Sequence, residues 1–436
     1  MKIPLPKPSI FAFLIAALSG TIQAASAATV TTNGYEILVN GTRFVFKGVN
    51  YSPVPTGALP EYSPHGDYFI PYYENVWKGD LDLMRAAGVN SIRLYAGNPD
   101  LNAGAPGTAG NWKAFLDYAY NNNNRPIYVF MTSYLDQATV EHGGNLSLYQ
   151  NQWSKLVKST VNHPAVVGYT LGNEIFDRAS KNSKSAFWQN YGKILASAYQ
   201  AGIASGKAPF LMAAINDEPI GVTPNQYWPV IQAGEESGQI ANLNAWAINV
   251  YRGPHFGEPG NNPIPNYRNQ MDKLRKKPLL IGEFGTPHST RTAQIYMAGR
   301  KTAAPGTGAI VELDTIPAGE FGNGRPYEGG RSQGDFLTSE WKVIKGDYSK
   351  SVASSTVSGG FVFNWSDEWY KHGGDPYVHA GGPNLAFFGP NFAGGYWDEK
   401  WFGITDSLSQ DYYRGSKTPV KRPTHSGYEA LKGMYK

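Results

Sequence analysis

Apolar positions along the chain follow two alternating patterns, short continuous runs and longer amphipathic segments. Continuous runs rich in β-branched residues predict strands buried on both faces, whereas apolar residues three or four apart predict helices with one buried face. The predicted strands are residues 46–50, 89–95, 127–131, 166–174, 209–215, 245–251, 278–283 and 360–365. The predicted helices are residues 75–87, 111–120, 148–161, 185–205, 230–236, 267–274, 336–351 and 428–434.

Strict alternation of strand and helix predicts a parallel sheet, and eight such units predict a closed (β/α)8 TIM barrel. An open, doubly wound sheet is the alternative, but no glycine-rich phosphate-binding turn follows the first strand. Before the barrel, Asn40-Gly41 predicts the turn of a β-hairpin formed by residues 37–39 and 43–45, which we expect to plug the bottom of the fold. Residues 284–334 and 367–406 are predicted to be long βα loops after strands 7 and 8, and loops of that length are usually functional.

The N-terminal residues have the features of an export signal. Lys2 and Lys7 precede a short apolar core at residues 10–18, and Ala25-Ser-Ala27 provides a cleavage site, with a competing site ending at Ala24. We therefore expect residues 1–27 to be a signal peptide and residues 28–436 to form a single catalytic domain of a secreted or periplasmic protein. The apolar core is too short to span a bilayer, and no later stretch is long enough.

Composition excludes several classes of function. The chain has no cysteine, so it has neither disulfides nor thiolate metal sites. Its net charge of +4 is too small to indicate a nucleic-acid partner. The eight histidines lack a metal-ligand spacing such as His-Glu-x-x-His, so we expect no metal and no other cofactor. Aromatic residues make up 14% of the chain, which favours a carbohydrate ligand weakly, because sugar rings stack on aromatic faces.

Two predicted strands end in a glutamate, Glu174 and Glu283. Active sites of TIM barrels lie at the C-terminal ends of the strands, so these carboxylates should meet at one rim. Paired carboxylates are what acid/base cleavage of a glycosidic bond requires. Polar or aromatic residues also stand at or just past the other strand ends, and the candidates among them are Asn50, Arg93, Tyr95, Asn173, Tyr251 and Trp365.

Short motifs at these strand ends resemble those of clan A glycoside hydrolases. Leu171-Gly-Asn-Glu174 and Ile281-Gly-Glu-Phe284 look like the fourth-strand and seventh-strand motifs of that clan. Gly48-Val-Asn50 and Asn249-Val-Tyr251 are similar to other segments of it, and in particular of the β-1,3-glucanosyltransferases and related β-glucanases. As a pattern the similarity covers nearly the whole chain after residue 27, although only these short motifs match closely.

The resemblance implies a role for each candidate. Glu174 would be the general acid/base and Glu283 the nucleophile of a retaining mechanism, with the two carboxyl groups about 5–5.5 Å apart. Asn173 would bind the sugar 2-hydroxyl. Arg93 and Tyr251 would keep Glu283 ionised and aimed, because a nearby cation favours the charged carboxylate.

The remaining candidates have a second, structural interpretation. Trp365 would be the floor under the reacting sugar, but it could equally be packing at a strand end. Asn50 could simply cap a turn. Asp217, Glu218, Asp367 and Glu368 follow strand ends too, and each could bind sugar hydroxyls or be a solvated loop carboxylate.

The expected function is hydrolysis of a β-linked polysaccharide or oligosaccharide, most readily a β-glucan, without a protein partner. A transglycosylase that uses the same two glutamates is the alternative within the enzyme class. A non-catalytic carbohydrate-binding barrel and a structural envelope protein are the alternatives from other classes. The sequence leaves open the sugar, its linkage, endo- or exo-action and the oligomeric state.

Overall fold

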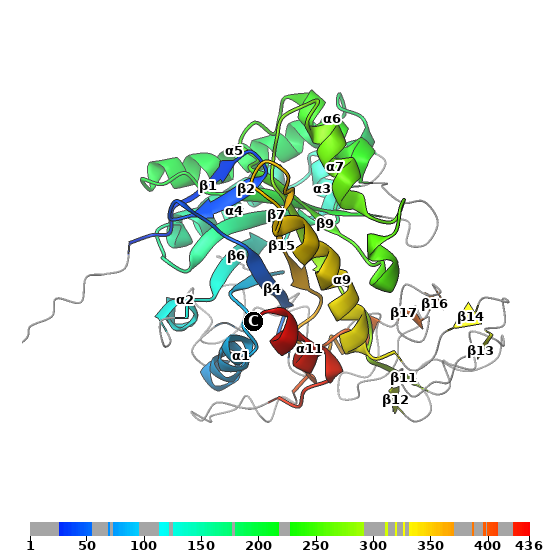
Figure 1. Ribbon diagram of the computed structural model, residues 1–436. Helices are drawn as coiled ribbons and strands as arrows, with labels where there is room; N and C mark the ends of the chain where they lie inside the picture. Colours follow the sequence, from blue (N-terminus) through cyan, green and yellow to red (C-terminus); the bar gives the residue numbers. More distant parts are fainter. Residues whose placement is uncertain are drawn as a thin grey trace, which may run out of the picture.

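The computed structural model describes residues 26–54, 69, 73–95, 113–121, 125–176, 179–217, 227–291, 310–312, 319–320, 326–327, 331–369, 386–387, 396–397, 399–408 and 422–436. A closed barrel of eight parallel strands organises these residues (Figure 1). The strands are β4 (Phe46–Tyr51), β5 (Ser91–Leu94), β6 (Tyr128–Ser133), β7 (Val166–Asn173), β8 (Leu211–Asn216), β9 (Ala245–Asn249), β10 (Leu279–Phe284) and β15 (Val357–Val362). Each strand pairs in parallel with its neighbours in chain order, and β15 returns to β4. The predicted (β/α)8 fold is therefore confirmed.

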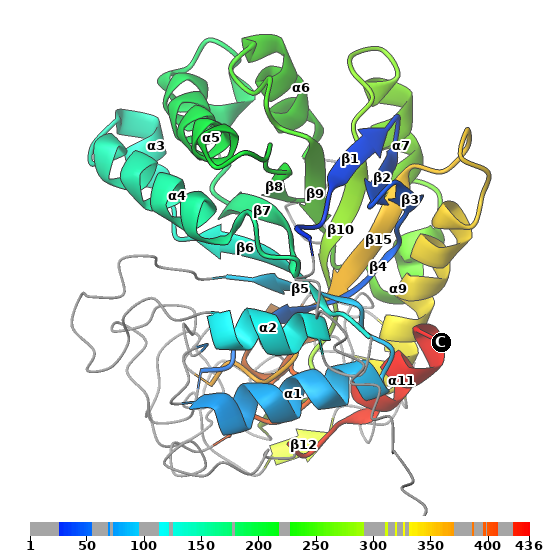
Figure 2. The same cartoon turned by 90° about the vertical axis from the view of Figure 1, so that its left-hand side faces the viewer.

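Helices follow the strands and pack outside them (Figure 2). They are α1 (Glu74–Ala86), α2 (Lys113–Asn121), α3 (Gln137–His142), α4 (Leu146–Thr160), α5 (Ala186–Ala204), α6 (Trp228–Ser237), α7 (Pro263–Met271), α9 (Gln333–Tyr348) and α11 (Ser426–Met434). The extra helix α3 was not predicted; it begins where the side chain of Asp136 accepts a hydrogen bond from the Thr139 N–H (2.8 Å).

The C-terminal helix α11 closes the outer ring. The Tyr428 hydroxyl donates to the Leu83 carbonyl of α1 (3.0 Å), and the Trp341 indole of α9 donates to the Met434 carbonyl (3.1 Å). Figure 1 shows α11 between α1 and α9. The last helix, α11, thus contacts both the first helix, α1, and the preceding helix of the ring, α9.

An antiparallel sheet closes the bottom of the barrel. Its strands are β1 (Val30–Asn33), β2 (Glu36–Val39) and β3 (Thr42–Arg43), so the predicted hairpin has one further strand. Ile37 and Val39 are buried in one cluster with Phe46 and Phe130 of the barrel interior. Because β4 begins at Phe46, this cluster lies at the N-terminal ends of the strands, away from the rim where Glu174 and Glu283 are expected.

The eighth barrel strand is shifted from its predicted position. The prediction placed it at residues 360–365, whereas β15 ends at Val362. Gly359 and Gly360 both lie inside the observed strand. Gly359 has φ +115°, and a Cβ atom there would lie 2.2 Å from the backbone of Phe46, so only glycine admits this close pairing with β4. The residues that follow Val362, rather than those that follow residue 365, therefore stand at the mouth of the barrel.

The long connections after β10 and β15 lie mostly outside the described residues. Short antiparallel pairs are described within them: β11 (Ser289–Arg291) with β12 (Ile310–Glu312), β13 (Gly319–Glu320) with β14 (Pro326–Tyr327), and β16 (Ala386–Phe387) with β17 (Tyr396–Trp397). Among the residues that the structure describes, no helix has both the length and the apolar character needed to cross a bilayer.

Candidate active site

Three hydrogen-bond donors surround the carboxylate of Glu283, near the end of β10. Its Oε1 accepts from Arg93 Nη1 (3.0 Å) and from the Tyr95 hydroxyl (2.5 Å), and its Oε2 accepts from the Tyr251 hydroxyl (2.5 Å). Burial and the charge of Glu283 raise the pKa of both tyrosines well above the ordinary value, so both are neutral hydroxyl donors at neutral pH. This arrangement suits a carboxylate in its ionised, acceptor-only form.

Arg93 is fully enclosed behind this carboxylate. Burial opposes its charge, but Tyr95 and Glu283 outweigh burial and raise the pKa of Arg93. Its Nη1 also contacts Asn50 Oδ1 and the Gly282 carbonyl, both at 3.3 Å, while the Asn50 amide donates to the same carbonyl (3.1 Å). Asn50 therefore fixes the guanidinium from behind and, unlike Arg93, is not among the residues that line the cleft.

Glu174 stands directly after β7 with a backbone in the left-handed region, φ 55°. A non-glycine residue in that region costs on the order of 1 kcal/mol, and such strain concentrates at functional sites. The side-chain amide of Asn249, the last residue of β9, donates to Glu174 Oε1 (2.7 Å) and to Asn173 Oδ1 (3.1 Å). Arg93 Nη2 donates to the same Asn173 oxygen (2.5 Å), so a continuous hydrogen-bond network joins the two glutamates.

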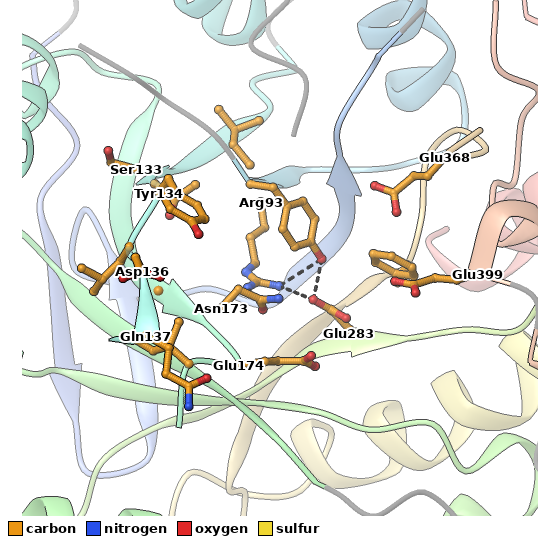
Figure 3. A pocket seen from close by; sticks show the side chains of 17 residues that line it. Arg93, Ser133, Tyr134, Asp136, Gln137, Asn173, Glu174, Glu283, Glu368 and Glu399 are labelled. Carbon is orange, nitrogen blue, oxygen red and sulfur yellow. Dashed lines mark hydrogen bonds and ion pairs between the residues drawn. The ribbon is translucent and has the colours of Figure 1, made fainter. Parts of the chain in front are cut away.

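Both glutamates face one cleft of about 320 Å³. Figure 3 shows Ser133, Tyr134, Asp136 and Gln137 on one side, Glu368 and Glu399 on the other, and Glu174 and Glu283 between them. Tyr134 lines this cleft and is 50% exposed.

The charge of this cleft is mostly negative. Among the residues that the structure describes, its lining includes five carboxylates, Asp136, Glu174, Glu283, Glu368 and Glu399, and one cation, Arg93, which is bound to Glu283. A ligand bearing a further negative charge would be repelled there.

The structure brings most of the predicted residues together and separates one. Glu174, Glu283, Arg93, Tyr95, Asn173 and Tyr251 form the connected network, with Asn50 behind it. Trp365 is fully buried in the core, where its ring lies 6.1 Å from that of Tyr428. Because β15 ends three residues earlier, Phe363 occupies the cleft in its place, with its ring 6.1 Å from Tyr95 and 6.2 Å from Tyr251.

The other loop candidates have mixed outcomes. Asp217 is buried in an ion pair with Arg252 (2.7 Å), and Asp367 is buried beside His288. Glu368 lines the cleft, whereas Glu218 lies outside the described residues. Several aromatic residues of the two long loops are candidates for the walls of the cleft. Of these, Trp369 and Trp401 are described in full, and both are buried. The side chains of the others, Tyr296, Phe321, Tyr327, Tyr370, Tyr377, Tyr396 and Trp397, are outside the description.

Asn249, which donates to Glu174, was not among the site residues predicted from the sequence. Its place at the end of a predicted strand, in the segment Asn249-Val-Tyr251, could have indicated it. A Cβ atom on Gly282 would lie 2.5 Å from Asn249 Oδ1, so the glycine before Glu283 makes room for this amide.

Several curated proteins are similar to this chain in sequence. The "Probable 1,3-beta-glucanosyltransferase GAS3" of Saccharomyces cerevisiae is 30% identical over 151 residues, which are 32% of this chain and 25% of that protein. The "1,3-beta-glucanosyltransferase gas1" of Schizosaccharomyces pombe is 24% identical over 290 residues, 64% of this chain and 48% of that protein. The "1,3-beta-glucanosyltransferase gel2" of Aspergillus fumigatus is 28% identical over 167 residues, 38% of this chain and 33% of that protein. No family model matches the chain.

The resemblance to the β-1,3-glucanosyltransferases is thereby confirmed. The chain spans only a quarter to about half the length of these relatives. Solved structures agree on the fold: a β-glucuronidase from Ruminococcus gnavus superimposes with a TM-score of 0.53 at 13% identity, over 94% of this chain and 53% of that one. A β-glucuronidase from Dictyoglomus thermophilum gives 0.52 at 13% identity, over 94% of this chain and 53% of that one.

Proposed function

We propose that the protein is a retaining β-glycoside hydrolase or transglycosylase that acts on a β-glucan by double displacement. The observation that carries this proposal is the unequal surroundings of the two carboxylates. Glu283 accepts from one guanidinium and two hydroxyls, whereas Glu174 accepts from the neutral amide of Asn249. Two carboxyl groups in such different environments are typical of an acid/base and nucleophile pair.

In the first step, protonated Glu174 gives its proton to the glycosidic oxygen while a Glu283 oxygen attacks the anomeric carbon. The bond to the leaving sugar breaks as the ester bond to Glu283 forms. In the second step, Glu174 takes a proton from water or from a sugar hydroxyl, whose oxygen attacks the anomeric carbon. The ester bond breaks, and both carboxyl groups return to their starting protonation states.

The neighbouring side chains have separate tasks in these steps. Arg93, Tyr95 and Tyr251 orient Glu283 and, when it becomes the leaving carboxylate of the second step, stabilise its returning charge. Asn173, held by both Arg93 and Asn249, would bind the 2-hydroxyl of the reacting sugar. Tyr134, which is half exposed at the cleft, offers apolar surface to a sugar face, and the buried Phe363 lines the same cleft.

A neutral sugar fits the cleft better than a uronate. The structural neighbours are named β-glucuronidases, but the only cation lining this cleft among the described residues is Arg93, and Glu283 already pairs with it. The relatives in sequence are named 1,3-beta-glucanosyltransferases, which supports a β-1,3-glucan as substrate and transfer to a second sugar as an outcome. Transfer is thus the second candidate function, with the same two glutamates.

The remaining parts of the proposal concern the whole chain. Residues 1–27 would direct export, and residues 28–436 would act as one catalytic domain on extracellular or periplasmic polysaccharide. Neither a cofactor nor a protein partner is needed for the steps above.

The test is product analysis on β-1,3-, β-1,4- and β-1,6-glucans, a β-mannan and a β-glucuronide. Wild type is compared with Glu174→Gln, Glu283→Gln and the matched control Glu429→Gln, whose side chain is 63% exposed on α11. We expect a neutral β-glucan to be cut by wild type and control, with both active-site variants inactive and the glucuronide untouched. Products longer than the substrate would reveal transfer. Binding of a glucan without turnover would instead make the barrel a carbohydrate-binding protein.

A further inference from the structure

Two histidines and an aspartate that are far apart in the sequence come together beside the cleft. His288 follows β10, Asp367 follows β15, and His425 immediately precedes α11. One nitrogen or oxygen atom from each lies within 4.8 Å of the other two. His288 and Asp367 are buried, and His425 is partly buried.

Two of the three side chains, His288 and Asp367, are also held by hydrogen bonds to neighbours. His288 Nε2 lies 3.2 Å from Asp367 Oδ2, while its Nδ1 lies 2.6 Å from the hydroxyl of Ser289. The other oxygen of Asp367, Oδ1, accepts from the Gly403 N–H (2.8 Å). His288 can therefore direct Nε2 and Asp367 can direct Oδ2 toward a common point, with their remaining polar atoms fixed elsewhere.

His425 is held less firmly. Its Nε2 lies 2.8 Å from Asp406 Oδ1 but makes no hydrogen bond, so either ring nitrogen can be offered to the cluster. A metal-binding histidine usually gives its second ring nitrogen to a carboxylate, a backbone carbonyl or water, which fixes the tautomer and the orientation of the ring. In His288 the hydroxyl of Ser289 holds that second nitrogen, Nδ1.

We propose that His288, Asp367 and His425 bind a divalent transition-metal ion, most favourably Zn²⁺. Two imidazoles and one carboxylate form a known zinc donor set, and imidazole ligands favour first-row transition metals over Mg²⁺ or Ca²⁺. The two rings are stacked, with centroids 3.5 Å apart and planes at 18°. The nitrogen lone pairs of two stacked, nearly parallel rings point in the same direction and do not converge on one ion. Metal binding therefore requires one of the two rings to rotate out of the stack.

The site would connect parts of the chain that frame the cleft. Asp367 precedes Glu368, which lines the cleft, and His288 lies five residues after Glu283. His425 belongs to the C-terminal segment that closes the ring of helices. Without disulfides, a bound ion is a means of fastening these three segments to one another. The ion has no part in the proposed glycosidic chemistry.

The experiment uses the full chain after treatment with a chelator, titrated with ZnCl₂ by calorimetry and melted with and without Zn²⁺. We expect one equivalent to bind with submillimolar affinity and to raise Tm, because an ion that binds only the folded state stabilises it. Ca²⁺ should have no comparable effect. The double variant His288→Asn/His425→Asn should bind at least about 100-fold more weakly. The matched control His255→Gln, whose side chain is 31% exposed and pairs with Glu258, should bind as wild type does.

Crystals of the wild-type protein grown with Zn²⁺ give an independent readout if the double variant does not fold. An anomalous peak within coordination distance of His288, Asp367 and His425 supports the proposal. The absence of saturable Zn²⁺ binding, binding unchanged in a folded double variant, or an anomalous peak only at other residues would overturn it.

Discussion

Replacing Glu340 by glutamine should change how the stability of the protein depends on pH. Glu340 lies in α9, is 1% exposed and accepts a hydrogen bond from the backbone N–H of Gly253 (2.9 Å). Burial raises the pKa of Glu340 from 4.5 to about 8, against the opposing effect of hydrogen bonds from the backbone of Gly253 and Arg252. The folded protein thus keeps this carboxyl protonated at neutral pH.

The sign and size of the effect follow from that rise. In the unfolded chain the group ionises near its ordinary pKa, so between about pH 4.5 and pH 8 the folded state holds a proton that the unfolded state has lost. The free energy of unfolding therefore falls as pH rises through this window and levels off above it. A rise in pKa from 4.5 to about 8 corresponds to roughly 5 kcal/mol. Glutamine is isosteric and uncharged, so Glu340→Gln should remove this fall.

The assay is urea unfolding of wild type, Glu340→Gln and the exposed control Glu429→Gln, at a series of pH values from about 4.5 to 9. We expect the stability of Glu340→Gln relative to wild type to increase steadily across the window, while Glu429→Gln runs parallel to wild type. Parallel curves for wild type and Glu340→Gln would refute the reasoning, because they would mean that Glu340 ionises equally in both states.

Three other substitutions test the site and its support. Tyr251→Phe removes one hydrogen-bond donor to Glu283. Because a hydrogen bond to a charged group contributes about 1.5–3 kcal/mol, kcat/KM should fall roughly 10–100-fold while the stability of the protein changes little. Unchanged kinetics would exclude this contact from catalysis. Tyr134→Ala should raise KM for oligosaccharides more than it lowers kcat, and an equal KM would mean that no sugar stacks on that ring. Gly285→Ala places a Cβ atom 2.1 Å from the Phe363 carbonyl oxygen, so the variant should be less stable than wild type by at least about 1–3 kcal/mol in urea unfolding. A variant as stable as wild type would show that the backbones at Gly285 and Phe363 can move apart without cost.

The sequence was most informative about the rim of the barrel. Glu174, Glu283, Arg93 and Tyr251 were found because each stands at or just after the end of a buried strand. Parallel strands bring their C-terminal ends to one side of the barrel, so residues at the ends of different strands lie close together in the fold. No knowledge of side-chain packing was required for that inference.

The prediction was wrong where local composition conflicted with packing. The apolar run from Gly360 to Trp365 predicted the last strand three residues too late and made Trp365 a candidate for the floor of the cleft as well as for packing. The tight approach of β15 to β4 requires glycine, and this could be seen only once Phe46 was known to lie opposite. Phe363 lines the cleft as a result.

The cluster of His288, Asp367 and His425 could not be predicted at all. Its members stand at positions 288, 367 and 425, far apart in the sequence, and none has the spacing of a metal-binding motif. Only the closure of the barrel and the docking of α11 bring them together.

The central claim is that Glu283 forms a covalent bond with the sugar. The most direct measurement uses a 2-deoxy-2-fluoro-β-glucosyl fluoride extended by a β-1,3-linked glucose. Fluorine at C2 slows both formation and hydrolysis of the glycosyl-enzyme, whereas the good leaving group fluoride speeds its formation, so the covalent intermediate accumulates. Mass spectrometry of peptides from the inactivated protein should find the added sugar on Glu283, and Glu283→Gln should remain unlabelled. Labelling of a different residue, or steady turnover without any covalent adduct, would contradict the assignment.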